Sequence, residues 1–178
     1  MTEANELARP VTLDPWPDQD AIDIAVHASD AECAALAERF GWLGLADVAA
    51  ELRIERDGAD LFVLTGRLEA QVTRKCVVTL EPVTERVEEA VHQRFERVAA
   101  WDALPREREV DMAMEPDDVE PLVGPVLDVG EVVAESLALA LDPYPRSVEA
   151  DAVAREAGVV SEGDVGSAAF AELGRLKN

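Results

Sequence analysis

Apolar and polar residues alternate along residues 47–74, and this alternation is the clearest pattern in the chain. A period of two is typical of β-strands that bury one face and expose the other. The pair Asp57-Gly58 interrupts the alternation with residues that favour a hairpin turn, and apolar positions resume from Leu64 to Val72. The pattern therefore predicts a one-faced antiparallel hairpin.

Two other segments place their apolar residues at helical spacing. Ser29, followed three residues later by Glu32, is a capping-box pattern, and the apolar stripe after it ends at Gly41. Asp128 precedes a second and wider apolar stripe, which Pro143 ends. Because so wide an apolar surface must be buried, we expect the second helix to pack across the sheet.

Short strands are expected before the first helix, over residues 9–13 and 22–26, and Pro10 favours an edge position for the first of them. Residues 83–98 are ambiguous. Their apolar residues fit a helical stripe better than a strand, since strict alternation would place Glu85, Glu89 and Gln93 on the apolar face.

These elements predict an α+β fold, in which a small antiparallel sheet, made of the hairpin 47–74 and flanking strands, is packed by one or two helices. We expect a single domain over residues 1–146. Residues 102–120 are rich in acidic residues and proline, so they are expected to form a mobile, solvated loop. Residues 147–178 are expected to form a mobile tail with one weak helix near residues 168–176.

Composition adds a strong negative charge, because 38 acidic residues stand against 16 basic ones and give a net charge of −22. Half of the basic residues, 8 of them, lie with 10 acidic residues in the segment 51–97, between two acidic flanks. Any anion-binding face must lie in that segment, whereas the flanks favour basic partners. Without a secretory signal or an apolar run of membrane-spanning length, we expect a cytoplasmic protein with reduced cysteines.

Signatures of catalysis and metal binding are weak. Cys33, Cys76, His27 and His92 are widely spaced, so they do not form the paired ligand set of a structural zinc site or a cysteine nucleophile with a recognisable base. The glycines match neither the P-loop nor the dinucleotide pattern. We expect no catalytic residue, no metal and no cofactor, with Cys76 anchoring a turn. An uncharacterised hydrolase is the remaining enzymatic alternative.

Two segments carry a resemblance to a known family. The first reads GRLEAQVTRKCVVTLEPV over residues 66–83, and the second reads DVGEVVAESLALALDPYPR over residues 128–146. Together they resemble the alphaproteobacterial branch of the YceD family, the large ribosomal RNA subunit accumulation proteins. Many relatives have a Cys-x-x-Cys where this chain has Cys76 and Thr79.

The resemblance implies a third strand, over residues 83–98, that pairs with the hairpin. We adopt the strand because a sheet of two strands is marginal alone. The resemblance also implies a role in the accumulation of large-subunit ribosomal RNA, without enzymatic activity. The family-motif positions that it implies for function are Cys76, Leu80, Glu81, Pro82, Val83, Glu131, Glu135, Asp142, Pro143, Tyr144, Pro145 and Arg146.

Two mechanisms remain open. In the first, the protein binds ribosomal RNA directly, and in the second it is an acidic holder of a basic large-subunit ribosomal protein, with the loop 102–120 imitating the phosphate backbone. We prefer the second, because an acidic background weakens each phosphate contact. No membrane and no small-molecule partner are expected. The candidate contact residues for RNA or a partner are Arg53, Arg67, Arg74, Lys75, Arg86, Arg94, Tyr144 and Arg146.

Overall fold

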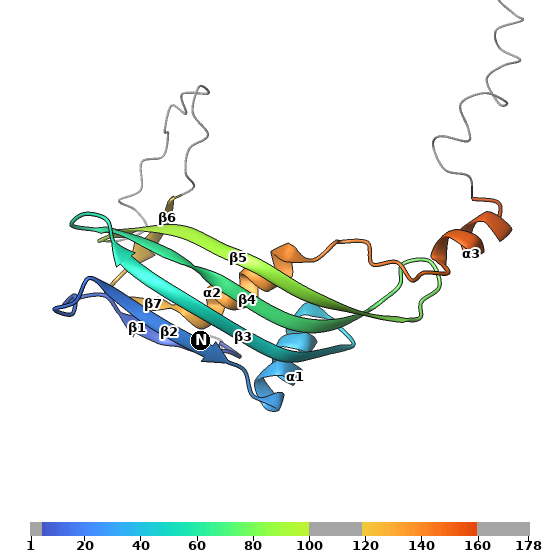
Figure 1. The fold of residues 1–178 in the computed structure, drawn as a ribbon, viewed down its shortest axis with the longest axis horizontal. Helices are drawn as coiled ribbons and strands as arrows, with labels where there is room; N and C mark the ends of the chain where they lie inside the picture. Colours follow the sequence, from blue (N-terminus) through green and yellow to red (C-terminus); the bar gives the residue numbers. More distant parts are fainter. Residues whose placement is uncertain (1–4, 100–118, 160–178) are drawn as a thin grey trace, which may run out of the picture. The chain divides into compact units, whose positions relative to one another are not determined.

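The computed structural model describes residues 5–99 and 119–159 (Figure 1). Within them the chain has an α+β fold, as predicted. The elements in chain order are β1 (Pro10–Thr12), β2 (Ala21–His27), α1 (Asp30–Phe40), β3 (Gly44–Arg56), β4 (Leu61–Lys75), β5 (Pro82–Val98), β6 (Val119–Val123), β7 (Val126–Asp128), α2 (Val129–Ala140) and α3 (Ala150–Glu156).

The described residues fall into two compact units. The first contains the described residues up to Thr73 and those from Thr84 to Asp142, and it holds the main sheet with helices α1 and α2. The second contains Arg74–Val83 and the described residues from Pro143 onward, including α3. The chain therefore passes three times between the units, after Thr73, after Val83 and after Asp142.

The main sheet has five strands in the order β2-β3-β4-β5-β6, and a separate two-stranded sheet pairs β1 with β7. Strands β3 and β4 form the predicted antiparallel hairpin, with Ala50 opposite Leu68 and Ile54 opposite Leu64. All four of these side chains are buried, so the alternation in the sequence does mark the core face. Strands β6 and β7 were not predicted, and β6 occupies the last two residues of the predicted loop 102–120.

One core-face position of the hairpin holds a glycine because the two backbones approach closely there. Gly66 of β4 lies opposite Leu52 of β3, on the face that Leu64 and Leu68 share. A Cβ at Gly66 would overlap the backbone oxygen of Glu51 and would lie 2.9 Å from the Leu52 Cα. Only glycine lets the two strands approach so closely here.

Residues 82–98 form a strand, β5, as the resemblance implied. Its buried residues Val87, Val91 and Phe95 are four positions apart, and this spacing produced the helical stripe in the sequence. Glu89 and Gln93 do lie on the same side of the strand as these residues, but Glu89 is exposed and Gln93 is half-buried. Their polar groups therefore stay hydrated, which removes the objection to a strand.

Both predicted helices are present, and both lie on the same face of the main sheet (Figure 1). Ser29 and Glu32 form the expected capping box of α1, and Gly41 ends that helix in the left-handed conformation. Leu36 of α1 and Val133 and Leu137 of α2 are fully buried in the core. The weak helix predicted near residues 168–176 lies outside the described residues, as does most of the acidic loop, whereas α3 was not predicted.

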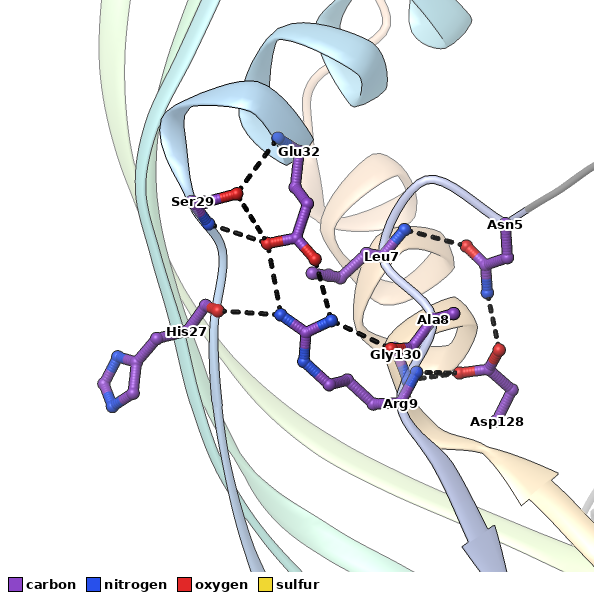
Figure 2. Close-up of polar contacts among 9 residues, drawn as sticks. All are labelled: Asn5, Leu7, Ala8, Arg9, His27, Ser29, Glu32, Asp128 and Gly130. Carbon is purple, nitrogen blue, oxygen red and sulfur yellow. Dashed lines mark hydrogen bonds and ion pairs between the residues drawn. The ribbon is translucent and has the colours of Figure 1, made fainter.

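The chain before β1 is held against the start of α2 (Figure 2). The Asp128 carboxylate caps α2 through the Gly130 N–H, at 3.0 Å, and also accepts the Arg9 N–H at 2.7 Å. Asn5 donates its side-chain amide to the same carboxylate, at 2.8 Å. Leu7, between these contacts, is fully buried, so this segment is part of the core. No helix in the described residues is long and apolar enough to span a membrane.

Candidate functional site

The first motif segment forms a closed turn between β4 and β5, within the second unit. The Cys76 N–H donates to the Glu81 carbonyl at 2.8 Å, and the Leu80 N–H donates to the Cys76 carbonyl at 3.0 Å. Leu80 has a φ of 62°, a left-handed conformation that is uncommon for a residue with a branched side chain. Its side chain is 70% exposed, so the turn presents an apolar tip.

The second motif segment lies against this turn. The Val77 N–H donates to the Pro145 carbonyl at 2.9 Å, and the Ser147 N–H donates to the Cys76 Sγ at 3.3 Å. The hydroxyls of Thr79 and Ser147 are 3.4 Å apart. Two segments about seventy residues apart in sequence therefore meet at Cys76, and we call residues 76–81 with 143–147 the motif junction.

Cys76 is the centre of the motif junction. Its Sγ is fully buried and accepts backbone N–H groups from Val78, Thr79 and Ser147, at 3.3–3.4 Å. Burial raises the pKa of the Cys76 thiol, but the hydrogen bonds from Thr79, Ser147 and Val78 outweigh it and lower the pKa to about 6. At neutral pH the group is therefore a thiolate that ties three backbone donors together, without exposed surface for a substrate.

The ordinary pKa of this group is 9.0, so the thiolate stabilises the folded state above pH 9 and this contribution is lost as the pH falls toward 6. We expect ultraviolet thiolate absorbance to titrate near pH 6 in the folded protein. Replacing Cys76 by Ser should remove that transition and lower the melting temperature by a few degrees at pH 9, with a smaller loss at pH 6.

Cys33 supplies the matched control for this titration, because burial raises its thiol pKa. The Cys33→Ser variant should keep the transition near pH 6. A folded Cys76→Ser variant that still titrates there would contradict the assignment of the thiolate.

Three of the candidate arginines already hold carboxylates of the first unit. Arg53 contacts Asp23 at 2.9 Å and Glu55 at 3.3 Å. Arg86 contacts Glu69 at 2.8 Å and Glu88 at 3.0 Å. Arg94 lies 3.6 Å from Asp57. The charge of each of these cations is therefore largely neutralised within the protein.

The other basic candidates differ among themselves. Arg67 is exposed and, among the described residues, makes no ion pair, although it faces Glu51 in the strand register. Arg74 is buried, against the expectation of an exposed basic edge. Lys75 is exposed, and Arg146 pairs with Asp151 at 2.8 Å. Of the candidate arginines in the first unit, Arg67 alone makes no ion pair among the described residues.

The acidic motif residues belong to α2 and have separate surroundings. Glu131 forms a two-pronged ion pair with Arg39 of α1, a residue that sequence reasoning did not single out. Burial raises the pKa of Glu135, and the charges of Glu131 and Glu120 raise it further, against the effect of Arg39. Asp142 ends the first unit, and Tyr144, 69% exposed, lies in the second. Sequence reasoning also missed Ser147, whose backbone completes the contacts of Cys76.

The described residues contain no group of three or more His, Cys, Asp and Glu side chains placed to hold a metal ion. The chain is thus a small α+β protein in which two distant segments meet at a buried cysteine, held by hydrogen bonds. Comparison with protein families matches residues 64–177 to the family described as large ribosomal RNA subunit accumulation protein YceD. Because the match covers more than half of the chain, the protein belongs to the YceD family.

The family description connects the protein with accumulation of the large ribosomal RNA subunit. The matched region includes both motif segments, so the motif junction lies entirely within it. No curated protein and no solved structure matched the chain.

Proposed function

We propose that the protein is a cytoplasmic, non-enzymatic factor that supports large-subunit biogenesis by binding a basic ribosomal protein of that subunit. The family supplies the connection with the large subunit. The charges of the surface favour a protein partner over an RNA partner.

The ion pairs of the candidate arginines favour a basic protein partner over RNA. Arg53, Arg86 and Arg94 each contact a carboxylate of the same chain. An RNA phosphate would have to displace these carboxylates, so the gain from each new contact would be reduced by the loss of an existing one. A basic protein requires no such exchange, since it can bind the remaining acidic groups directly.

The overall negative charge also favours a basic protein partner. At −22, the chain repels a polyanion during approach and attracts a cation. Exposed charges of this kind raise the association rate of an oppositely charged protein more than they raise its final affinity. The proposed interaction should therefore be fast and sensitive to salt.

Direct RNA binding is the second candidate, and Arg67 is the observation that favours it. This arginine is exposed on β4 and makes no ion pair within the part of the chain that the structure describes. A single such cation provides one phosphate contact, and neighbouring Arg53 would have to leave Asp23 to provide another.

A pull-down of the tagged full-length protein from cell lysate, with and without RNase, tests the proposal. We expect basic large-subunit ribosomal proteins to remain bound after RNase treatment. The recovered protein, purified and titrated against the full chain, should lose affinity by about tenfold or more between about 0.1 and about 0.5 M salt.

The double variant Arg53→Gln/Arg67→Gln separates the two candidates. If the partner is a basic protein, its affinity should be unchanged or slightly higher, because two positive charges are gone. If RNA is the partner, RNA affinity should drop and the salt slope should flatten by about one unit for each phosphate contact removed. Capture that disappears with RNase, together with the weaker RNA binding of the variant, would overturn the proposal.

A further inference from the structure

Within residues 5–99 and 119–159, most of the outer edge of strand β5 has no strand paired with it. It spans 17 residues, but β6 pairs only with its last five, from Arg94 opposite Val119 to Val98 opposite Val123. Over residues 84–93 no strand in the described residues pairs with this edge, and Figure 1 shows β5 continuing past β6. Alternate backbone N–H and C=O groups there can pair with another strand.

The residues of this open edge are suited to one kind of strand. The stretch 84–93 contains neither proline nor lysine, the residues that most often protect an exposed edge. Its charges are Glu85, Glu88 and Glu89 against Arg86, which is itself paired with Glu69 and Glu88. The edge is therefore acidic, so it favours a basic strand and disfavours a second copy of this acidic chain.

A cavity of about 320 Å³ lies where the open edge meets β6. Glu120 of β6 and Glu135 of α2 line it, together with His92 and the 86% exposed Leu139. Arg94 also lines the cavity, but its guanidinium lies 3.6 Å from Asp57. At about 30 Å³ per water, the volume holds about ten waters, which is room for a long side chain.

The electrostatics of the cavity favour a cation. The pKa of Glu135 is raised by burial and by the neighbouring carboxylates of Glu131 and Glu120, so the ionised form of Glu135 is under repulsion. A positive charge between Glu120 and Glu135 would relieve this repulsion, and Leu139 at the rim would cover the aliphatic part of a lysine or arginine.

We propose that the outer edge of β5 over residues 84–93 receives an extended basic segment of the partner as an added β-strand, and that the cavity beside it receives one lysine or arginine of that segment. Main-chain hydrogen bonds supply the general affinity in such an addition, and a side-chain pocket supplies the selectivity. This inference rests on the proposed function, since it gives the basic partner its binding site.

Amide hydrogen exchange of the full chain locates the site directly. The probe is a synthetic ten-residue peptide that alternates lysine and valine. We expect it to slow exchange over residues 84–93 more than anywhere else in the sheet. The same peptide with N-methylated backbone amides keeps the charge but loses the donors of a strand, so it should give no such protection. A peptide alternating glutamate and valine should not bind.

The double variant Glu120→Gln/Glu135→Gln tests the cavity. This variant should bind the lysine–valine peptide about tenfold more weakly than the wild type. The matched control Glu38→Gln/Glu51→Gln has the same change of charge outside the edge and cavity, and its affinity for the peptide should stay within about twofold of the wild type. All four residues are exposed, Glu135 with a partly desolvated carboxylate, and a thermal melt of each variant verifies the fold.

The outcomes distinguish this inference from the proposed function. If the ribosomal protein from the pull-down binds without protecting residues 84–93 and with equal affinity for both double variants, the edge is not its site, and the inference falls while the proposed function stands. If no basic ribosomal protein binds, both fall. Protection of residues 84–93 that grows with protein concentration in the absence of peptide would identify a second copy as the occupant and overturn the inference.

Discussion

Replacing Gly130 by alanine is expected to destabilise the protein by about 3 kcal/mol. A Cβ at this position would overlap the carbonyl oxygen of Leu7 and would lie 2.8 Å from the Leu7 carbonyl carbon. Both atoms are backbone, so no side-chain rotation can relieve the overlap. Either α2 or the segment before β1 must move, and Leu7 would then lose its fully buried position.

Chemical denaturation of Gly130→Ala at pH 7 measures this effect, and Gly44→Ala is the matched control. A Cβ at Gly44 would meet only the Thr73 side chain, at 3.8 Å, which is an ordinary contact. The free energy of unfolding of the control should lie within about 0.5 kcal/mol of the wild-type value. Equal midpoints for the two variants would show that the segment around Leu7 is not packed on α2 as Figure 2 shows.

Replacing Arg9 by glutamine is expected to cost about 2 kcal/mol at pH 7. The guanidinium holds the Glu32 carboxylate at 2.8 and 3.1 Å and also donates to the His27 carbonyl at 3.0 Å (Figure 2). The ion pair is only partly exposed, at 31% and 24% of the two side chains, so water screens it less than a surface pair. It joins the N-terminal segment to the start of α1.

The pH dependence of unfolding checks the cause of this loss. The ion pair with Arg9 and the hydrogen bonds from Ser29 lower the pKa of Glu32 from 4.5 to about 2. The ionised carboxylate therefore stabilises the fold above pH 4.5, and that contribution is lost as the pH falls toward 2. The difference between wild type and Arg9→Gln should shrink over this interval. A difference that stays constant from pH 7 to pH 2 would show that Arg9 contributes by packing alone.

Local patterns were sufficient for the elements whose residues interact mainly with near neighbours. The alternation over residues 47–74 predicted the hairpin because β3 and β4 bury one face along most of their length. Ser29 with Glu32, and Asp128, predicted the helix starts because a cap forms within one turn. The candidate site was harder to predict from local patterns. Cys76 was identified as a turn anchor, but its thiolate was not, since one of the three donors comes from Ser147.

The sequence by itself determined the hairpin and the two capped helices, the strong negative charge and, through its two motifs, the family to which the chain belongs. Only the tertiary structure decided which charges are available. Arg53 meets Asp23 and Arg39 meets Glu131 across 30 and 92 residues of sequence, because strand pairing and helix packing bring them together. Likewise, the sequence of β5 could not show that β6, among the described residues, pairs with only the last five residues of its outer edge, because the residues of one strand do not indicate where its neighbour begins. Periodicity predicts whether each residue is buried or exposed. A binding surface depends in addition on which residues, distant in sequence, lie next to one another on it.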